Sequence, residues 1–117
     1  MDVKGFYESV DGNYRSALAI MMNDMFIQRM LTKFFVSNAY PEIISSYEKK
    51  DFGACFAASH SFKGVVGNLA LTPLFEISSV ITEATRSQEP VNIDSEIEEL
   101  KKRYTFIESE YSKYSAN

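Results

Sequence analysis

The sequence has one cysteine, one histidine, no tryptophan and three prolines in 117 residues. A lone cysteine, Cys55, excludes a disulfide within the chain, and one cysteine with one histidine cannot supply the usual ligands of a zinc site. No apolar run approaches the roughly 18 residues that a membrane-spanning helix needs. The first residues lack a signal-peptide pattern, because Asp2 and Glu8 interrupt them and no apolar stretch follows. We therefore expect a cytoplasmic protein with no membrane segment.

Positive charge is also scarce. Twelve Lys and Arg residues stand against sixteen Asp and Glu residues, so the formal net charge is −4. This balance gives no support to nucleic-acid binding, which usually requires a basic surface. The chain also lacks a nucleophile-elbow pattern and a glycine-rich phosphate loop. A hydrolase triad or a nucleotide-binding enzyme is therefore not indicated.

Hydrophobic residues make up 45% of the chain and recur mostly at three- and four-residue spacing. This periodicity predicts an all-α protein, and the length suits a single domain spanning 1–117. Because the connections are short, neighbouring helices should run antiparallel. We expect an antiparallel four-helix bundle with additional N-terminal helices packed alongside, its helices lying at about 41–49, 52–69, 73–86 and 94–114.

The N-terminal part is less regular. We expect residues 1–12 to form a lead-in, with at most a short turn around Phe6 and Tyr7. Asn13 is a suitable cap for the helix that follows, and Asp24 could cap a second helix after a break. Methionine-rich faces usually belong to a plastic core surface. We assign that role here to three residues, Met21, Met22 and Met25.

The predicted helix at 52–69 carries the histidine, His60. With roughly 100° of rotation per residue, Lys63, Gly64 and Gly67 fall on the same face as His60. Glycine in a helix interior costs about 0.5–1 kcal/mol relative to alanine, so two glycines beside the imidazole suggest that a partner approaches the backbone there. The opposite face is apolar, with Cys55, Ala58, Phe62, Val65, Val66 and Leu69.

The segment His60-Ser-Phe-Lys63-Gly64-Val-Val-Gly67-Asn-Leu resembles the signature of the histidine-containing phosphotransfer (HPt) family. That signature is a histidine on a helix, a lysine three residues later, a glycine four residues later and a small residue at plus seven. Family members often have a further glycine at plus ten, where this chain has Ala70. The resemblance implies a four-helix bundle, the architecture that the periodicity predicts independently.

The resemblance also implies a function. His60 would accept a phosphoryl group, by family analogy at Nε2, from a receiver-domain aspartate or a kinase, and pass it to another response-regulator receiver in a two-component phosphorelay. Lys63 would offset the phosphoryl charge, while Gly64 and Gly67 would give the partner access. The protein would be a monomeric phosphoprotein without a cofactor or enzyme activity of its own, because the receiver domain supplies the Mg²⁺. Its expected partners are receiver domains and a histidine kinase.

Three alternatives remain open from the sequence. His60 could be an ordinary surface or capping histidine. The same chemistry could belong to the HPt domain of a chemotaxis-type or hybrid histidine kinase, although the start at Met1 favours a free-standing protein. The chain could also be a helical interaction module that carries no phosphate. Phosphate transfer from a receiver domain would separate these cases.

Overall fold

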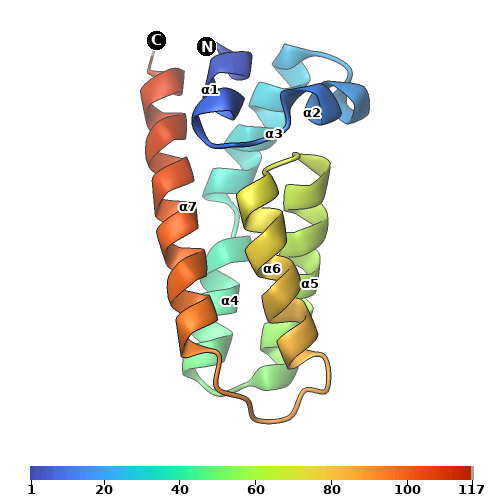
Figure 1. The fold of residues 1–117 in the computed structure, drawn as a ribbon, viewed down its shortest axis with the longest axis vertical. Helices are drawn as coiled ribbons and strands as arrows, with labels where there is room; N and C mark the ends of the chain where they lie inside the picture. The colour runs from blue at the N-terminus through green and yellow to red at the C-terminus, as the bar shows by residue number, and fades with distance from the viewer. Residues whose placement is uncertain (117) are drawn as a thin grey trace.

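The computed structural model describes residues 1–116, and all regular elements in that range are α-helices (Figure 1). The predicted all-α fold class is therefore confirmed. None of the helices in this range is both long enough and apolar enough to span a membrane. The helices are α1 (Val3–Ser9), α2 (Tyr14–Met21), α3 (Asp24–Val36), α4 (Ala39–Glu48), α5 (Phe52–Asn68), α6 (Thr72–Thr85) and α7 (Asp94–Ser115).

Helices α4 to α7 pack side by side, and successive helices run in opposite directions along the long axis (Figure 1). Their ends lie within two residues of the predicted boundaries. Helix α3 precedes α4 and lies roughly in line with it, beyond the end of the bundle where α5 ends and α6 begins (Figure 1). The two helices are separated by a break at Ser37, whose ψ of 168° is extended. Helices α1 and α2 lie across that same end (Figure 1).

Aromatic rings join the bundle helices to α3. The ring of Phe34 lies 5.6 Å from that of Phe62 and 6.0 Å from that of Tyr104, and Tyr40 stacks on Tyr104 at 3.8 Å between centroids. Such aromatic pairs contribute beyond the apolar area that they bury. The remaining core is mainly aliphatic and includes Ile27, Leu31, Ile43, Val66, Leu69, Leu71, Leu74, Ile81, Ile97, Leu100 and Ile107.

The predicted lead-in contains a helix, α1, which the sequence reasoning missed. The Asp2 side chain caps it by accepting a hydrogen bond from the Gly5 amide at 2.9 Å. Phe6 is fully buried and meets the rings of Tyr111 and Tyr114 edge-on. A helix of seven residues is marginal on its own, so α1 depends on this packing against α7.

The methionine-rich face is not a core surface, contrary to the prediction. Met21 is buried, but Met22 and Met25 are 80% and 71% exposed. The cause is the turn between α2 and α3, where Met22 adopts a φ of 79° and the helical period is interrupted. Residues on either side of this turn therefore do not share one face.

The caps at the N-terminal helices agree with the sequence in part. The Asn13 side chain accepts a hydrogen bond from the Ser16 amide at 3.0 Å, as expected for the cap of α2. The cap of α3 is Asn23, which accepts from the Phe26 amide at 2.8 Å, and not Asp24. Asp24 is the first residue of α3 and instead accepts a hydrogen bond from a tyrosine hydroxyl of α2.

Tyr7 links α1 to the end of α5, and its loss should destabilise the protein. Its buried hydroxyl donates to the Leu69 carbonyl at 2.6 Å. Tyr7→Phe removes the donor and leaves that carbonyl without this bond, so we expect the free energy of unfolding to fall by about 1–2 kcal/mol in urea denaturation. Tyr14→Phe is the matched control, because its exposed hydroxyl binds Asp24 and should matter little. Equal stability of wild type and Tyr7→Phe would contradict the assigned role.

The same residue gives the stability a pH dependence. Burial raises the pKa of Tyr7 well above its usual value near 10. Above about pH 10 the Tyr7 phenol loses its proton in the unfolded chain but keeps it in the folded protein. The free energy of unfolding should therefore fall as the pH rises above this value. The fall should be smaller in Tyr7→Phe, which has no phenol at this position.

Candidate functional site

Helix α5 has a defined start and end. The Asp51 side chain caps it by accepting a hydrogen bond from the Ala54 amide at 3.1 Å. The helix ends at Asn68, and Ala70 then adopts a left-handed conformation with a φ of 54°. Glycine is usual at such a position after a helix. A glycine at plus ten in the signature would therefore belong to the end of the helix, and Ala70 takes that place in this chain. The Asn13 amide donates to the Ala70 carbonyl at 2.9 Å and ties this turn to the N-terminal helices.

The predicted orientation of α5 is largely correct. His60 and Gly64 are exposed on one side, while Cys55 and Phe62 are fully buried on the other. Val65 is the exception, because it is 41% exposed although it was assigned to the apolar face. It lies at the edge of that face, where the core does not cover it.

A row of α6 residues runs beside the His60 face. Its members are spaced by four, four and three residues, so they share one side of α6. We call them the α6 row: Phe75, Ser79, Glu83 and Arg86. Contacts at both ends of this row, described below, place it against α5, which runs antiparallel to α6 (Figure 1).

The two glycines of the site have different surroundings. A Cβ atom added at Gly64 would have nothing within 4 Å, so the surface there is open. A Cβ atom added at Gly67 would lie 3.3 Å from the Phe75 ring. The same ring lies 5.7 Å from the Lys63 ammonium, within the range of a cation–π contact. Gly67 therefore gives Phe75 a place to pack, and Phe75 in turn positions Lys63.

The other end of the site is formed by Phe56 and Arg86. The Phe56 ring lies 5.8 Å from the imidazole of His60, with 31° between the ring planes. The Arg86 guanidinium lies over the Phe56 ring, 5.4 Å from its centre. One aromatic ring therefore contacts both His60 and Arg86.

Arg86 is paired with Glu83. Its Nη2 and Nε atoms donate to the two carboxylate oxygens at 2.6 and 3.2 Å. These hydrogen bonds and the arginine charge lower the pKa of Glu83, and the charge of Lys63 makes a smaller contribution in the same direction. The site thus contains two cations, Lys63 and Arg86, and one carboxylate.

The site residues on α5 could be predicted from the sequence, whereas those contributed by α6 could not. Phe75, Glu83 and Arg86 share a helical side in the sequence, but nothing in their spacing indicates which neighbour that side faces. Phe56 could have been found, because it lies four residues before His60 and hence on the same part of α5. Its contact with Arg86 required the register between the two helices.

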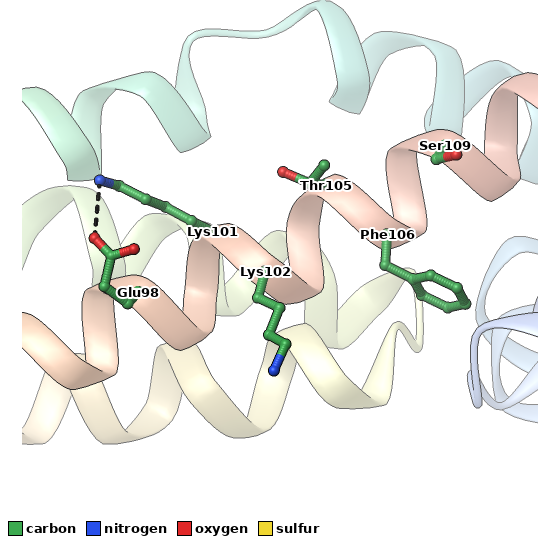
Figure 2. A pocket seen from close by; sticks show the side chains of 6 residues that line it. All are labelled: Glu98, Lys101, Lys102, Thr105, Phe106 and Ser109. Carbon is green, nitrogen blue, oxygen red and sulfur yellow. Dashed lines mark hydrogen bonds and ion pairs between the residues drawn. The ribbon is translucent and has the colours of Figure 1, made fainter.

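The arrangement offers an exposed imidazole, with Lys63 one helical turn away and Arg86 over the neighbouring Phe56 ring. Within residues 1–116, no group of three or more His, Cys, Asp or Glu side chains could hold a metal ion. A hollow on the surface of α7 has no member of the His60 site, and its lining is drawn in Figure 2. A second hollow lies between the α4–α5 and α6–α7 connections and also lacks His60.

Comparison of the chain with family models, curated proteins and solved structures gives no match. The main feature of the site is the exposed His60, one helical turn from Lys63 and from the open surface at Gly64.

Proposed function

We propose that the protein is a histidine phosphotransfer protein of a two-component phosphorelay, with His60 as the phosphoacceptor. The observation that supports this most strongly is the exposed imidazole on a helix, with bare backbone one turn away at Gly64. Lys63 and Arg86 provide positive charge on the same side. The chain resembles the HPt family in the same residues, His60, Lys63, Gly64 and Gly67.

The proposed reaction is a reversible exchange between a nitrogen and an oxygen. The lone pair of the imidazole nitrogen attacks the phosphorus of a receiver-domain aspartyl phosphate. As the N–P bond forms, the P–O bond to the aspartate breaks and its electron pair returns to the carboxylate. The other ring nitrogen keeps its proton, so no base is needed to remove one. Transfer to the next receiver is the reverse of these steps.

Positioning and charge stabilisation dominate phosphoryl transfer, and the protein supplies part of each. Lys63 stabilises the negative oxygens of the group on His60. Phe56 restricts the imidazole on one side and also contacts the Arg86 guanidinium. The receiver domain supplies the Mg²⁺ and the aspartate, so the complete active site forms between two proteins.

Access for a receiver domain is provided by the open surface at Gly64. Phe75 is 39% exposed and contacts Lys63 and the Gly67 position, so an apolar side chain is available on the same side of the bundle as the histidine. An exposed apolar patch beside a polar centre is typical of an interaction site. We propose receiver domains as the partners that dock there, with a histidine kinase as the original phosphate source.

Transfer in both directions tests this proposal. The protein is mixed with a phosphorylated receiver domain and Mg²⁺, repurified, and then mixed with a second, unphosphorylated receiver. We expect phosphate to move to the protein in the first step and to the second receiver in the next. If a panel of phosphorylated receivers transfers nothing, the proposal is wrong, and a helical interaction module without phosphate becomes the better description.

The role of Lys63 can be tested by its rate effect. Lys63→Ala should keep the fold and still accept phosphate, because the metal of the receiver carries much of the charge. The single-turnover rate should fall about tenfold to a hundredfold, or roughly 1.4–2.7 kcal/mol. Lys63→Arg should recover part of the loss, since it restores the charge with a different shape.

Lys102 on α7 provides the matched control. It is an exposed lysine whose side chain points from the surface of α7 (Figure 2), so Lys102→Ala should transfer at the wild-type rate. If Lys63→Ala is as fast as wild type, Lys63 is a solvated neighbour with no part in the reaction.

A further inference from the structure

We propose that Glu83 is a positioning residue that competes with the phosphoryl group for Arg86 and so favours onward transfer from His60. This inference rests on the proposed function. It concerns how long the phosphate stays on the histidine, a property that the HPt-like residues of α5 do not explain. Glu83 acts through Arg86 and is not itself expected to touch the reacting atoms.

The geometry of the pair supports a competition. Both carboxylate oxygens of Glu83 are used by Arg86, so this arrangement occupies the Nε and Nη2 donors of the guanidinium. The two side chains are 63% and 53% exposed, so water can replace either partner and the pair can open. An arginine held in this way is available to a stronger anion without unfolding any part of α6.

Phosphorylation would introduce that stronger anion. A phosphoryl group carries a charge of about −1.5 to −2 at neutral pH and three acceptor oxygens, whereas Glu83 carries one negative charge. Arg86 already lies over the Phe56 ring, and the same ring faces His60. A rotation of the guanidinium over this ring would bring its donors toward the phosphoryl oxygens. Turning Nε and Nη2 toward the phosphoryl group would break their hydrogen bonds to Glu83.

The carboxylate therefore opposes the phosphorylated state in the free protein. It is bonded to Arg86, and the charge of Lys63 makes a smaller contribution to lowering its pKa. Without Glu83, both cations would be free to stabilise the phosphoryl group. With it, the phosphohistidine is less stable and transfer to a receiver becomes more favourable. Exposed ion pairs have small energies, so the expected effect is about two- to fivefold.

Glu83→Gln tests the proposal, because it keeps the size of the side chain and removes its charge. His60 is phosphorylated with phosphoramidate, a small chemical donor that needs no receiver. We expect the half-life of the phosphohistidine to increase about two- to fivefold and the equilibrium with a receiver domain to shift toward the protein by the same factor. Glu83→Asp should give intermediate values.

Glu98→Gln is the matched control. Glu98 forms an exposed ion pair with Lys101 at 3.2 Å, three residues apart on α7, and its removal changes the net charge equally (Figure 2). It should leave the half-life unchanged. An equal effect in both variants would show that overall charge is responsible, and the proposal would be wrong.

A double variant tests whether Glu83 acts through Arg86. In an Arg86→Gln background, Glu83→Gln should change the half-life by less than half of its effect in the wild type. A full effect in that background would overturn the competition. Inorganic phosphate, titrated into the unphosphorylated protein and followed by the NMR signals of His60, gives a second readout. It should bind about two- to fivefold more tightly to Glu83→Gln.

These readouts separate the two proposals. If receivers transfer no phosphate but inorganic phosphate binds Glu83→Gln more tightly, the phosphorelay function is wrong and the competition stands. If receivers transfer phosphate but neither the half-life nor the phosphate affinity changes, the competition is wrong and the phosphorelay function stands.

Discussion

Replacing His60 with glutamine is expected to abolish phosphate acceptance and to leave the fold intact. The side chain is exposed on α5, opposite the fully buried Phe62, and substitutions at such positions usually change the free energy of unfolding by no more than about 0.5 kcal/mol. Glutamine has no ring nitrogen that can attack phosphorus. Circular dichroism and thermal melting report the fold, and labelling from a phosphorylated receiver reports acceptance.

Ser61 is the control for this experiment. It is exposed next to His60 and has a hydroxyl, which is the obvious competing acceptor. Ser61→Ala should be labelled normally. Normal labelling of His60→Gln, or loss of labelling in Ser61→Ala, would show that the phosphate resides elsewhere.

Replacing Gly64 with glutamine should also remove most of the transfer activity, by a different mechanism. The new side chain would project from the open surface where we propose that the receiver docks. We expect the single-turnover rate to fall by at least about a hundredfold, or roughly 2.7 kcal/mol. The protein should meanwhile be no less stable, because a helix-interior glycine is removed.

Gly64→Ala separates access from backbone stiffness. A methyl group at this position has nothing within 4 Å, so it should raise the free energy of unfolding by about 0.5–1 kcal/mol and leave transfer close to normal. Both variants stiffen the helix, but glutamine alone blocks the surface. A sharp fall in stability with normal transfer in Gly64→Gln would show that Gly64 serves packing.

The bundle could be predicted from the sequence because its helices are long and strongly periodic. The apolar residues of α7 recur at three- and four-residue spacing, and the structure buries four of them: Ile97, Leu100, Tyr104 and Ile107. Helix α1 could not be predicted in the same way. It has seven residues, too few to establish a period, and Phe6 becomes a core residue through contacts with residues more than a hundred positions away.

The turn at Met22 shows a second limit. Periodicity placed Met22 and Met25 on one core face, but a single residue with positive φ redirects the chain between them. Met22 carries no residue-type signal for such a conformation, which glycine or asparagine would normally mark. The predicted break near this position is present. The sequence did not show that the break would turn Met22 and Met25 away from the core.

For the candidate site, the limit lies between helices. The relation among His60, Lys63 and Gly64 follows from one helix, where the angle per residue is known. The contacts of Phe75 and Arg86 depend on the position of α6 along the axis of α5, which is set by the packing of the whole interface between the two helices. Gly67 illustrates the difference: its place on the face was predicted, but its contact with Phe75 was visible only in the structure.

The most direct test of the account is the chemical identity of the phosphate on the wild-type protein. After incubation with a phosphorylated receiver domain and Mg²⁺, the protein is separated, exposed to acid and to base, and mapped by mass spectrometry. We expect a phosphate that acid removes and base does not, located on the peptide that contains His60. An absence of phosphate, or an acid-stable phosphate on a serine, threonine or tyrosine, would contradict this expectation.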